Sequence, residues 1–205
     1  IRGMTSTKGA HQQGNYFMHT SYAQRATIVH PSMGAWVTKL DGRFNPTLPG
    51  AVVVGGGSRH PLSGFLPTSH QPLAVGNPSE GLRNCERLWG MTNEKFSDGL
   101  SLSQKLDHSF LQKYNFDKVN AYSDMYDDAV QLMKSHDLQA FDLKEETAST
   151  RDAYGEDNFG QGVLLARRLV ERQVRFVEVQ LGGWDTHQNN FTRVQERSAI
   201  LDQAL

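Results

Sequence analysis

The segment from residue 174 to residue 191, VRFVEVQLGGWDTHQNNF, constrains the fold more than any other part of the chain. Its first half, residues 174–181, is rich in Val and Phe and follows an amphipathic helical pattern at residues 159–172. A helix that leads into a short apolar strand is typical of parallel sheets, because both faces of their strands are buried. The segment therefore predicts an α/β fold with a mostly parallel sheet flanked by helices.

The polar loop after this strand is the strongest candidate for a functional site. Gly182 and Gly183 end the strand and allow a ligand to approach the backbone closely. Asp185 and His187 are two residues apart, so in an extended chain both side chains project to the same side. Such a carboxylate and imidazole are typical of a pair of metal ligands, or of a base with its orienting partner. The alternative is structural, with Asp185 capping the next helix and His187 packing on Trp184.

Five blocks of the sequence resemble one protein family, in the right order along the chain. They are GNYFMHTSY, HPSMGAWV, AFDLKEETASTRDAYG, FGQGVLLARRLVERQVRFVEV and LGGWDTHQNNF. The family is the domain-of-unknown-function-1501 family of exported bacterial proteins, which are usually described as sulfatase-like and placed near the alkaline-phosphatase superfamily. The resemblance implies an alkaline-phosphatase-like fold, a divalent metal ion and metal-dependent hydrolysis of sulfate or phosphate esters. It also implies a periplasmic or otherwise exported protein of which this chain is the central fragment.

Further candidate residues lie near the N-terminus. The resemblance places the nucleophile segment at residues 14–22, where a hydroxyl group would be deprotonated by a bound metal and attack phosphorus or sulfur. Thr20 and Ser21 are the hydroxyl candidates there, and Thr20 and His19 are the catalytic candidates. The alternative for Thr20 is a hydroxyl at a turn or a helix start. His11 joins the two residues of the WDTH loop as a candidate metal ligand.

Three other segments complete the predicted organisation. Residues 51–57, AVVVGGG, indicate a buried strand that ends in three glycines. Residues 58–84 are rich in Pro, Gly, Ser and His, which favours a long surface loop with little regular structure, in which His60 is an exposed polar group. From about residue 100 to residue 134 the apolar residues recur at spacings of three and four, which predicts helices whose apolar stripe packs in the core.

Composition limits the remaining classes of function. With 205 residues and 38% hydrophobic content the chain is long enough for one globular domain, residues 1–205. The net charge of −1 and the scattered basic residues exclude a nucleic-acid interface, and no apolar run reaches transmembrane length. The expected partner is a small anionic ester or another protein. The alternative to a hydrolase is a non-catalytic extracytoplasmic scaffold, or a subunit of a larger assembly, that keeps the fold.

Overall fold

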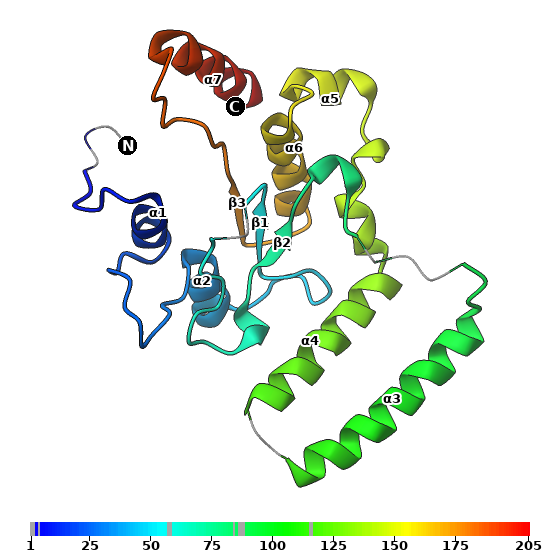
Figure 1. The fold of residues 1–205 in the computed structure, drawn as a ribbon. Coiled ribbons are helices and arrows are strands. Elements are labelled where there is room, and N and C mark those ends of the chain that lie inside the picture. Colours follow the sequence, from blue (N-terminus) through cyan, green and yellow to red (C-terminus); the bar gives the residue numbers. More distant parts are fainter. Residues whose placement is uncertain (1–2, 4, 57–58, 84, 86–88, 115–116) are drawn as a thin grey trace.

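A computed structural model of the chain describes residues 3, 5–56, 59–83, 85, 89–114 and 117–205. The described residues form a small parallel sheet with helices around it, which confirms the predicted α/β class (Figure 1). In chain order the elements are α1 (His11–Thr20), α2 (Met33–Asp41), β1 (Ala51–Val54), the 3-10 helix η1 (Thr68–His70), β2 (Leu73–Val75), η2 (Pro78–Glu80), α3 (Asn93–Lys113), α4 (Asp117–Lys134), η3 (His136–Phe141), η4 (Leu143–Glu145), α5 (Ala148–Tyr154), α6 (Asn158–Glu171), β3 (Phe176–Val179) and α7 (Asn190–Ala204).

The sheet has the strand order β2-β1-β3, and both neighbours of β1 run parallel to it. The central strand β1 has the sequence AVVV, and all four of its residues are buried. A strand that is covered on both faces needs apolar side chains on both, so its sequence does not alternate. The predicted strands before the glycine run and before the WDTH loop are therefore both confirmed, with β1 at the centre of the sheet.

Helix α6 covers one face of the sheet. Val54 and Val179 are register partners in β1 and β3, so their side chains share a face. Gly162 of α6 lies against them, because a Cβ atom at this position would stand 2.9 Å from Val179 and 3.2 Å from Val54. The absence of a side chain at Gly162 thus lets α6 pack closely on the strand that leads to the candidate site.

Helix α2 covers the opposite face. Ala51 and Phe176 are register partners on that face. A Cβ atom at Gly34 of α2 would stand 3.1 Å from Ala51 and 3.0 Å from Phe176. Glu178 follows Phe176 by two residues, so its side chain projects from the same face of β3. An acidic side chain therefore leaves the sheet on the side that α2 covers, near the carboxyl end of the strands.

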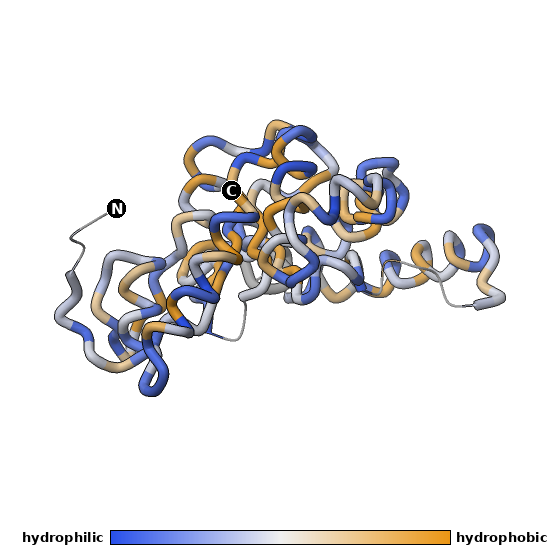
Figure 2. Tube along the Cα trace, turned by 90° about the horizontal axis from the view of Figure 1, so that it is seen from above, coloured by the Kyte–Doolittle hydropathy of each residue, from blue (hydrophilic) through white to orange (hydrophobic). Residues whose placement is uncertain are grey.

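The hydrophobic core lies between the sheet and α6. In α6 the buried leucines recur at spacings that place them on one helical face, as the sequence predicts. Figure 2 shows the hydrophobic segments gathered in this central part of the molecule. The largest fully buried aliphatic and aromatic side chains of this core are Leu48, Val52, Val54, Val75, Phe141, Leu164, Leu165 and Leu169.

A charged side chain of α6, Arg168, is buried at the margin of this core. Its Nε donates to the carbonyl oxygen of Ala140 at 3.0 Å, and its Nη2 donates to that of Gln139 at 2.8 Å. Its Nη1 lies 2.6 Å from Oε1 of Glu146. The guanidinium group therefore satisfies two backbone carbonyls of η3 and a carboxylate, and it fixes that segment to the helix that supports β3.

The expectation that residues 58–84 have little regular structure is wrong in one respect. This segment contains β2, which pairs with β1 through the register Val52–Leu73, Val53–Ala74 and Val54–Val75. A strand of three residues is too short to show an alternating pattern, and the surrounding Pro and Gly residues hide it. The hydrogen bonds that define β2 come from β1, which local sequence does not reveal.

The helices α3 and α4 form a hairpin that projects away from the sheet (Figure 1). Sequence analysis predicts that the apolar stripe of this region packs in the core, but Leu102 and Phe110 of α3 are 60% and 51% exposed. The prediction is wrong for α3, and also for Met125 and Tyr126 of α4, which are 41% and 42% exposed. Helical periodicity identifies an apolar face without identifying what covers it. No helix in the described part of the chain is both long enough and apolar enough to cross a membrane.

Candidate metal centre at the carboxyl end of the sheet

The loop of residues 180–189 connects β3 to α7 and carries two of the candidate ligands. Gly183 has a φ of +87°, a left-handed conformation that favours glycine, so the chain turns here as it leaves the sheet. Helix α7 has Asn189 at its N-cap, so Asp185 does not cap it and the structural alternative for this carboxylate is excluded. The hydroxyl group of Thr186 instead links the loop to α7 by donating to Oδ1 of Asn190.

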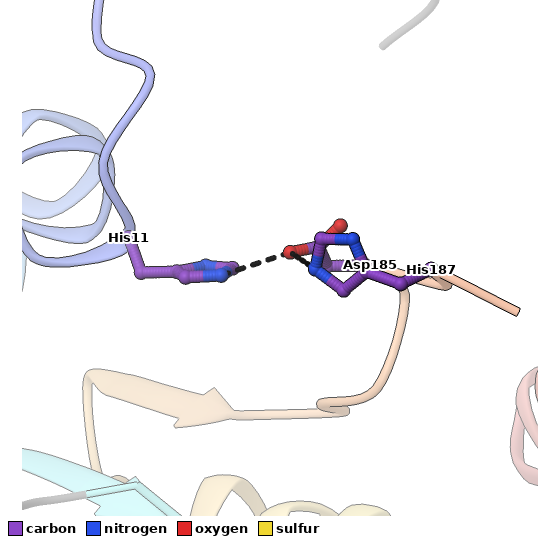
Figure 3. A group of neighbouring side chains, drawn as sticks. All are labelled: His11, Asp185 and His187. Carbon is purple, nitrogen blue, oxygen red and sulfur yellow. Dashed lines mark ion pairs between the residues drawn. The ribbon is translucent and has the colours of Figure 1, made fainter.

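Helix α1 brings His11 to this loop, as Figure 3 shows. Nε2 of His11 lies 2.8 Å from Oδ2 of Asp185, and Nε2 of His187 lies 3.2 Å from the same oxygen. The three side chains are 70%, 53% and 83% exposed, respectively, so solvent and solutes reach them. The structure therefore brings together all three residues that sequence analysis selected as candidate metal ligands, although His11 is far from the other two in the sequence.

The chemistry of these donors fits a divalent transition metal. Zinc and similar ions bind imidazole nitrogens and carboxylate oxygens at about 2.0–2.2 Å. The donor atoms of His11, Asp185 and His187 lie within 4.8 Å of one another, and their exposed side chains can turn towards a common ion. Three protein ligands leave a further coordination position open, which is the arrangement found in catalytic zinc sites.

A second cluster lies deeper, on the face of the sheet that α2 covers. Oε1 of Glu178 in β3 lies 2.8 Å from Nε2 of His19 in α1, and Oε2 lies 3.4 Å from Nε2 of His60. The side-chain amide of Gln180 donates to Oε1 of Glu178 at 2.6 Å. The side chain of His60 is 1% exposed, so the expectation of an exposed loop histidine is wrong. Its ring packs edge-on against that of His19 at 4.6 Å, which buries both.

The hydrogen bonds on the far sides of the two rings determine where their protons lie. Nδ1 of His19 is 2.7 Å from the carbonyl oxygen of Asn15, so it donates, and Nε2 can donate to Glu178 when the ring is protonated. Nδ1 of His60 accepts from the backbone N–H of Leu62 at 3.1 Å, so the proton of this ring is on Nε2 and faces Glu178. A metal ion bound to Nε2 of His60 would force the ring proton onto Nδ1. There it would face the backbone N–H of Leu62, which is itself a donor, and the hydrogen bond would be lost. We therefore assign this cluster as a hydrogen-bonded ion pair.

The pKa values of the pair reflect this arrangement. The hydrogen bond to Glu178 raises the pKa of His19; burial opposes the shift, and the Asn15 carbonyl and the charge of Glu178 reinforce it. Burial alone would raise the pKa of Glu178, but hydrogen bonds from His19 and Gln180, together with the nearby ring of His60, outweigh it and hold the pKa well below its usual range. At neutral pH Glu178 is therefore ionised, and protonation of His19 is favoured over that of an exposed histidine.

The stability that this pair contributes should depend on pH in both directions. A raised histidine pKa stabilises the fold fully below the unfolded value of about 6.5, and this stabilisation is lost as pH rises through the folded pKa. A depressed glutamate pKa stabilises the fold at pH values above the unfolded pKa of about 4.3, and this stabilisation is lost as pH falls through the folded pKa. We expect the difference in free energy of unfolding between the wild type and His19→Gln to be largest at about pH 5–6. Urea titrations across the pH range measure it, with the exposed His108→Gln as control; a difference independent of pH would contradict the assignment.

The catalytic candidates His19 and Thr20 are the last two residues of α1. Thr20 is the last residue of α1; its hydroxyl group is buried and donates to the carbonyl oxygen of Tyr16 at 2.7 Å. The hydroxyl oxygen of Thr20 also accepts a hydrogen bond from the backbone N–H of Tyr22 at 3.1 Å. These contacts are those of a helix-end hydroxyl, the alternative role for Thr20. Both ring nitrogens of His19 face hydrogen-bond partners, so in this arrangement His19 holds an ion pair rather than presenting a nitrogen to a substrate.

Glu178, Gln180 and the buried His60 are not among the residues predicted from the sequence. A signal for the first two was available, because a carboxylate and an amide two residues apart interrupt the apolar strand FVEVQ on one face. Such polar side chains on a strand that is otherwise apolar need partners, which directs attention to nearby histidines. No comparable signal marks His60, since its burial depends on the path of the loop after β1.

A cavity lies elsewhere in the described part of the chain. It has a volume of about 610 Å³ and lies between the outer strand β2 and helix α4, where Leu73, Val75, Met125 and Leu132 line it. None of the candidate ligands lines this cavity. Ionisable groups converge in the two side-chain clusters, whereas the cavity between β2 and α4 is mainly apolar, so the clusters are the stronger candidates for a reactive site. The WDTH loop is accessible at the surface, with Trp184 43% exposed and the side chain of His187 83% exposed.

The fold and these clusters define an α/β protein whose parallel sheet carries side chains suited to metal binding near the carboxyl ends of its strands. The chain belongs to the family described as protein of unknown function (DUF1501), whose family model matches residues 1–205. The family membership that the sequence blocks predicted is therefore confirmed. No curated protein and no solved structure matches the chain.

Proposed function

We propose that His11, Asp185 and His187 bind a divalent metal ion and that the protein is an exported, metal-dependent hydrolase of sulfate or phosphate esters. The observation that carries this proposal is the meeting of His11 with both residues of the WDTH loop at a single carboxylate oxygen, 2.8 and 3.2 Å away. Helix α1 and the loop after β3 are remote in the sequence. Their convergence on three metal-binding side chains in an accessible position is the arrangement that a metal centre requires.

The residues of the chain have separate tasks in this proposal. A bound ion would supply Lewis acidity, lowering the pKa of water and offsetting negative charge on the ester. Asp185 supplies the anionic ligand, and His11 and His187 supply neutral donors that hold the ion beside the open face of the loop. The hydroxyl group of Thr20 is turned into α1, so water, rather than Thr20, is the nucleophile that this arrangement favours.

The test is elemental analysis of the full-length protein after dialysis, together with hydrolysis of nitrophenyl phosphate and nitrophenyl sulfate. We expect about one divalent ion per chain in the wild type and none retained in the double variant Asp185→Ala/His187→Ala. The matched control is Asp107→Ala/His108→Ala, which removes an exposed carboxylate and imidazole from α3 and should leave the metal content unchanged. Equal metal content in the wild type and the site variant would reject the centre.

A second candidate function rests on a different observation. The apolar face of α3, with Leu102 and Phe110 more than half exposed, is suited to contact with a protein partner, as a non-catalytic exported scaffold or an assembly subunit would require. The two proposals differ in their expected results. Stoichiometric metal with ester hydrolysis supports the hydrolase, whereas an intact fold that hydrolyses neither ester, with or without added metal, supports the scaffold.

A further inference from the structure

Helix α1 has few apolar contacts to hold it against the rest of the molecule. Its sequence HQQGNYFMHT is largely polar, and Tyr16 and Thr20 are its only buried residues. The hydroxyl group of Tyr16 lies 2.7 Å from Nδ1 of His30 and accepts from the backbone N–H of His30 at 2.6 Å. The other strong attachment is the pair of His19 with Glu178. A helix that buries so little apolar surface depends on such polar contacts for its position.

The same helix connects the two clusters. His11, a ligand of the proposed metal centre, is the first residue of α1, and His19 is next to its last. Glu178, the partner of His19, lies in the strand that leads into the loop carrying Asp185 and His187. The helix and the strand are therefore joined at two places, through the partly buried ion pair at one end of α1 and through the exposed ligands at the other.

We propose that the His19–Glu178 pair is a positioning device that holds α1 against β3 and thereby delivers His11 to the metal centre. This inference rests on the proposed function, because it assigns His19 and Glu178 a role in the metal affinity of that same centre. The ion pair is shielded, with side chains 14% and 22% exposed, so it tethers the helix more firmly than a solvated pair would. The outer pair of His11 and Asp185 is exposed and cannot by itself fix the helix.

The consequence for metal binding follows from effective concentration. A ligand on a tethered helix meets the ion in an intramolecular step, and loosening the tether lowers the local concentration of that ligand. Glu178→Gln keeps the size of the side chain but removes the charge that pairs with His19. We expect this variant to bind Zn²⁺ about 10-fold more weakly, in the range seen when outer partners of metal ligands are altered. The weakening should not exceed that of His11→Ala, because Glu178 acts only through His11.

The decisive experiment is a double-mutant cycle with Zn²⁺ titration as the readout. It compares the wild type, Glu178→Gln, His11→Ala and the double variant, with the exposed Glu171→Gln on α6 as control. We expect Glu178→Gln to weaken binding about 10-fold in the wild type and by less than about twofold when His11 is already absent. Equal effects in the two backgrounds would overturn the inference, since general destabilisation would act whether or not His11 is present.

Hydrogen exchange of the α1 amides separates this inference from the proposed function. We expect Glu178→Gln to increase exchange at residues 14–20 of the metal-free protein while α6 keeps its protection. Unchanged exchange in α1 would overturn the positioning role even if the wild type binds zinc. If the wild type binds no zinc, the proposed function fails, and faster exchange in α1 would still support the tether itself. Faster exchange in α1, together with equal effects of Glu178→Gln on zinc binding in the presence and absence of His11, would reject the link to His11. The proposed metal centre would not be affected by that result.

Discussion

Asp185→Ala should remove stoichiometric metal binding, the largest effect that we expect from a single substitution in the candidate centre. Both histidines, His11 and His187, contact the same carboxylate oxygen, so Asp185 is the one residue that connects the other two. It is also the only anionic ligand of the three, and its charge contributes strongly to the attraction of a divalent cation. We expect the affinity for Zn²⁺ to fall by more than about 100-fold, beyond the range for outer partners of metal ligands.

The order of the effects is a sharper test than their size. His187→Ala and His11→Ala should each weaken Zn²⁺ binding by less than Asp185→Ala, because each leaves the carboxylate and one imidazole in place. Asp185→Asn, which keeps the shape and removes the charge, should resemble Asp185→Ala. Titrations of dialysed protein with Zn²⁺ measure all four variants. A variant Asp185→Asn with wild-type affinity, or a His11→Ala variant without effect, would show that these side chains meet without sharing an ion.

The parts of the structure that sequence predicted are those that local pattern determines. The uniformly apolar run at residues 51–54 identified β1, because it is short, rich in β-branched Val and followed by glycines, as expected of a strand covered on both faces. The helix-to-strand order identified α6 and β3, and the glycines after β3 identified a polar loop at the edge of the sheet. Asp185 and His187 followed from their spacing in that loop. Each of these inferences uses information within about twenty residues of the chain.

The remaining features depend on contacts between distant segments. The meeting of His11 with Asp185 requires α1 to lie beside the end of β3, which the sequence of α1 does not encode locally. The burial of His60 follows from the path of a loop whose composition predicts exposure. The position of α3 away from the core is a similar case, because an amphipathic pattern does not identify its own partner. Residue type could select the candidate ligands, but only the fold could show that three of them share one position.

Loss of the buried guanidinium in Arg168→Ala should destabilise the protein by about 3–5 kcal/mol, the largest effect on stability that we expect from a charged residue. The substitution leaves the carbonyls of Gln139 and Ala140 without their donor and leaves Glu146 with a single cationic partner. Unpaired buried polar groups are costly, whereas a solvated pair contributes little. Helix α6 supports β3, so the loss should also loosen the base of the candidate centre.

Arg167→Ala is the matched control, because Arg167 is adjacent on α6 and also binds Glu146, at 2.7 Å. Its hydrogen bond contributes even more than that of Arg168 to holding the pKa of Glu146 below its usual value. Its side chain is nevertheless 34% exposed, against 6% for Arg168. Water can therefore solvate Glu146 in place of much of the hydrogen bonding that Arg167 provided. We expect a loss of about 1 kcal/mol or less for Arg167→Ala by urea unfolding. Equal losses for the two variants would show that the shared carboxylate, rather than the backbone carbonyls of η3, determines the contribution of Arg168.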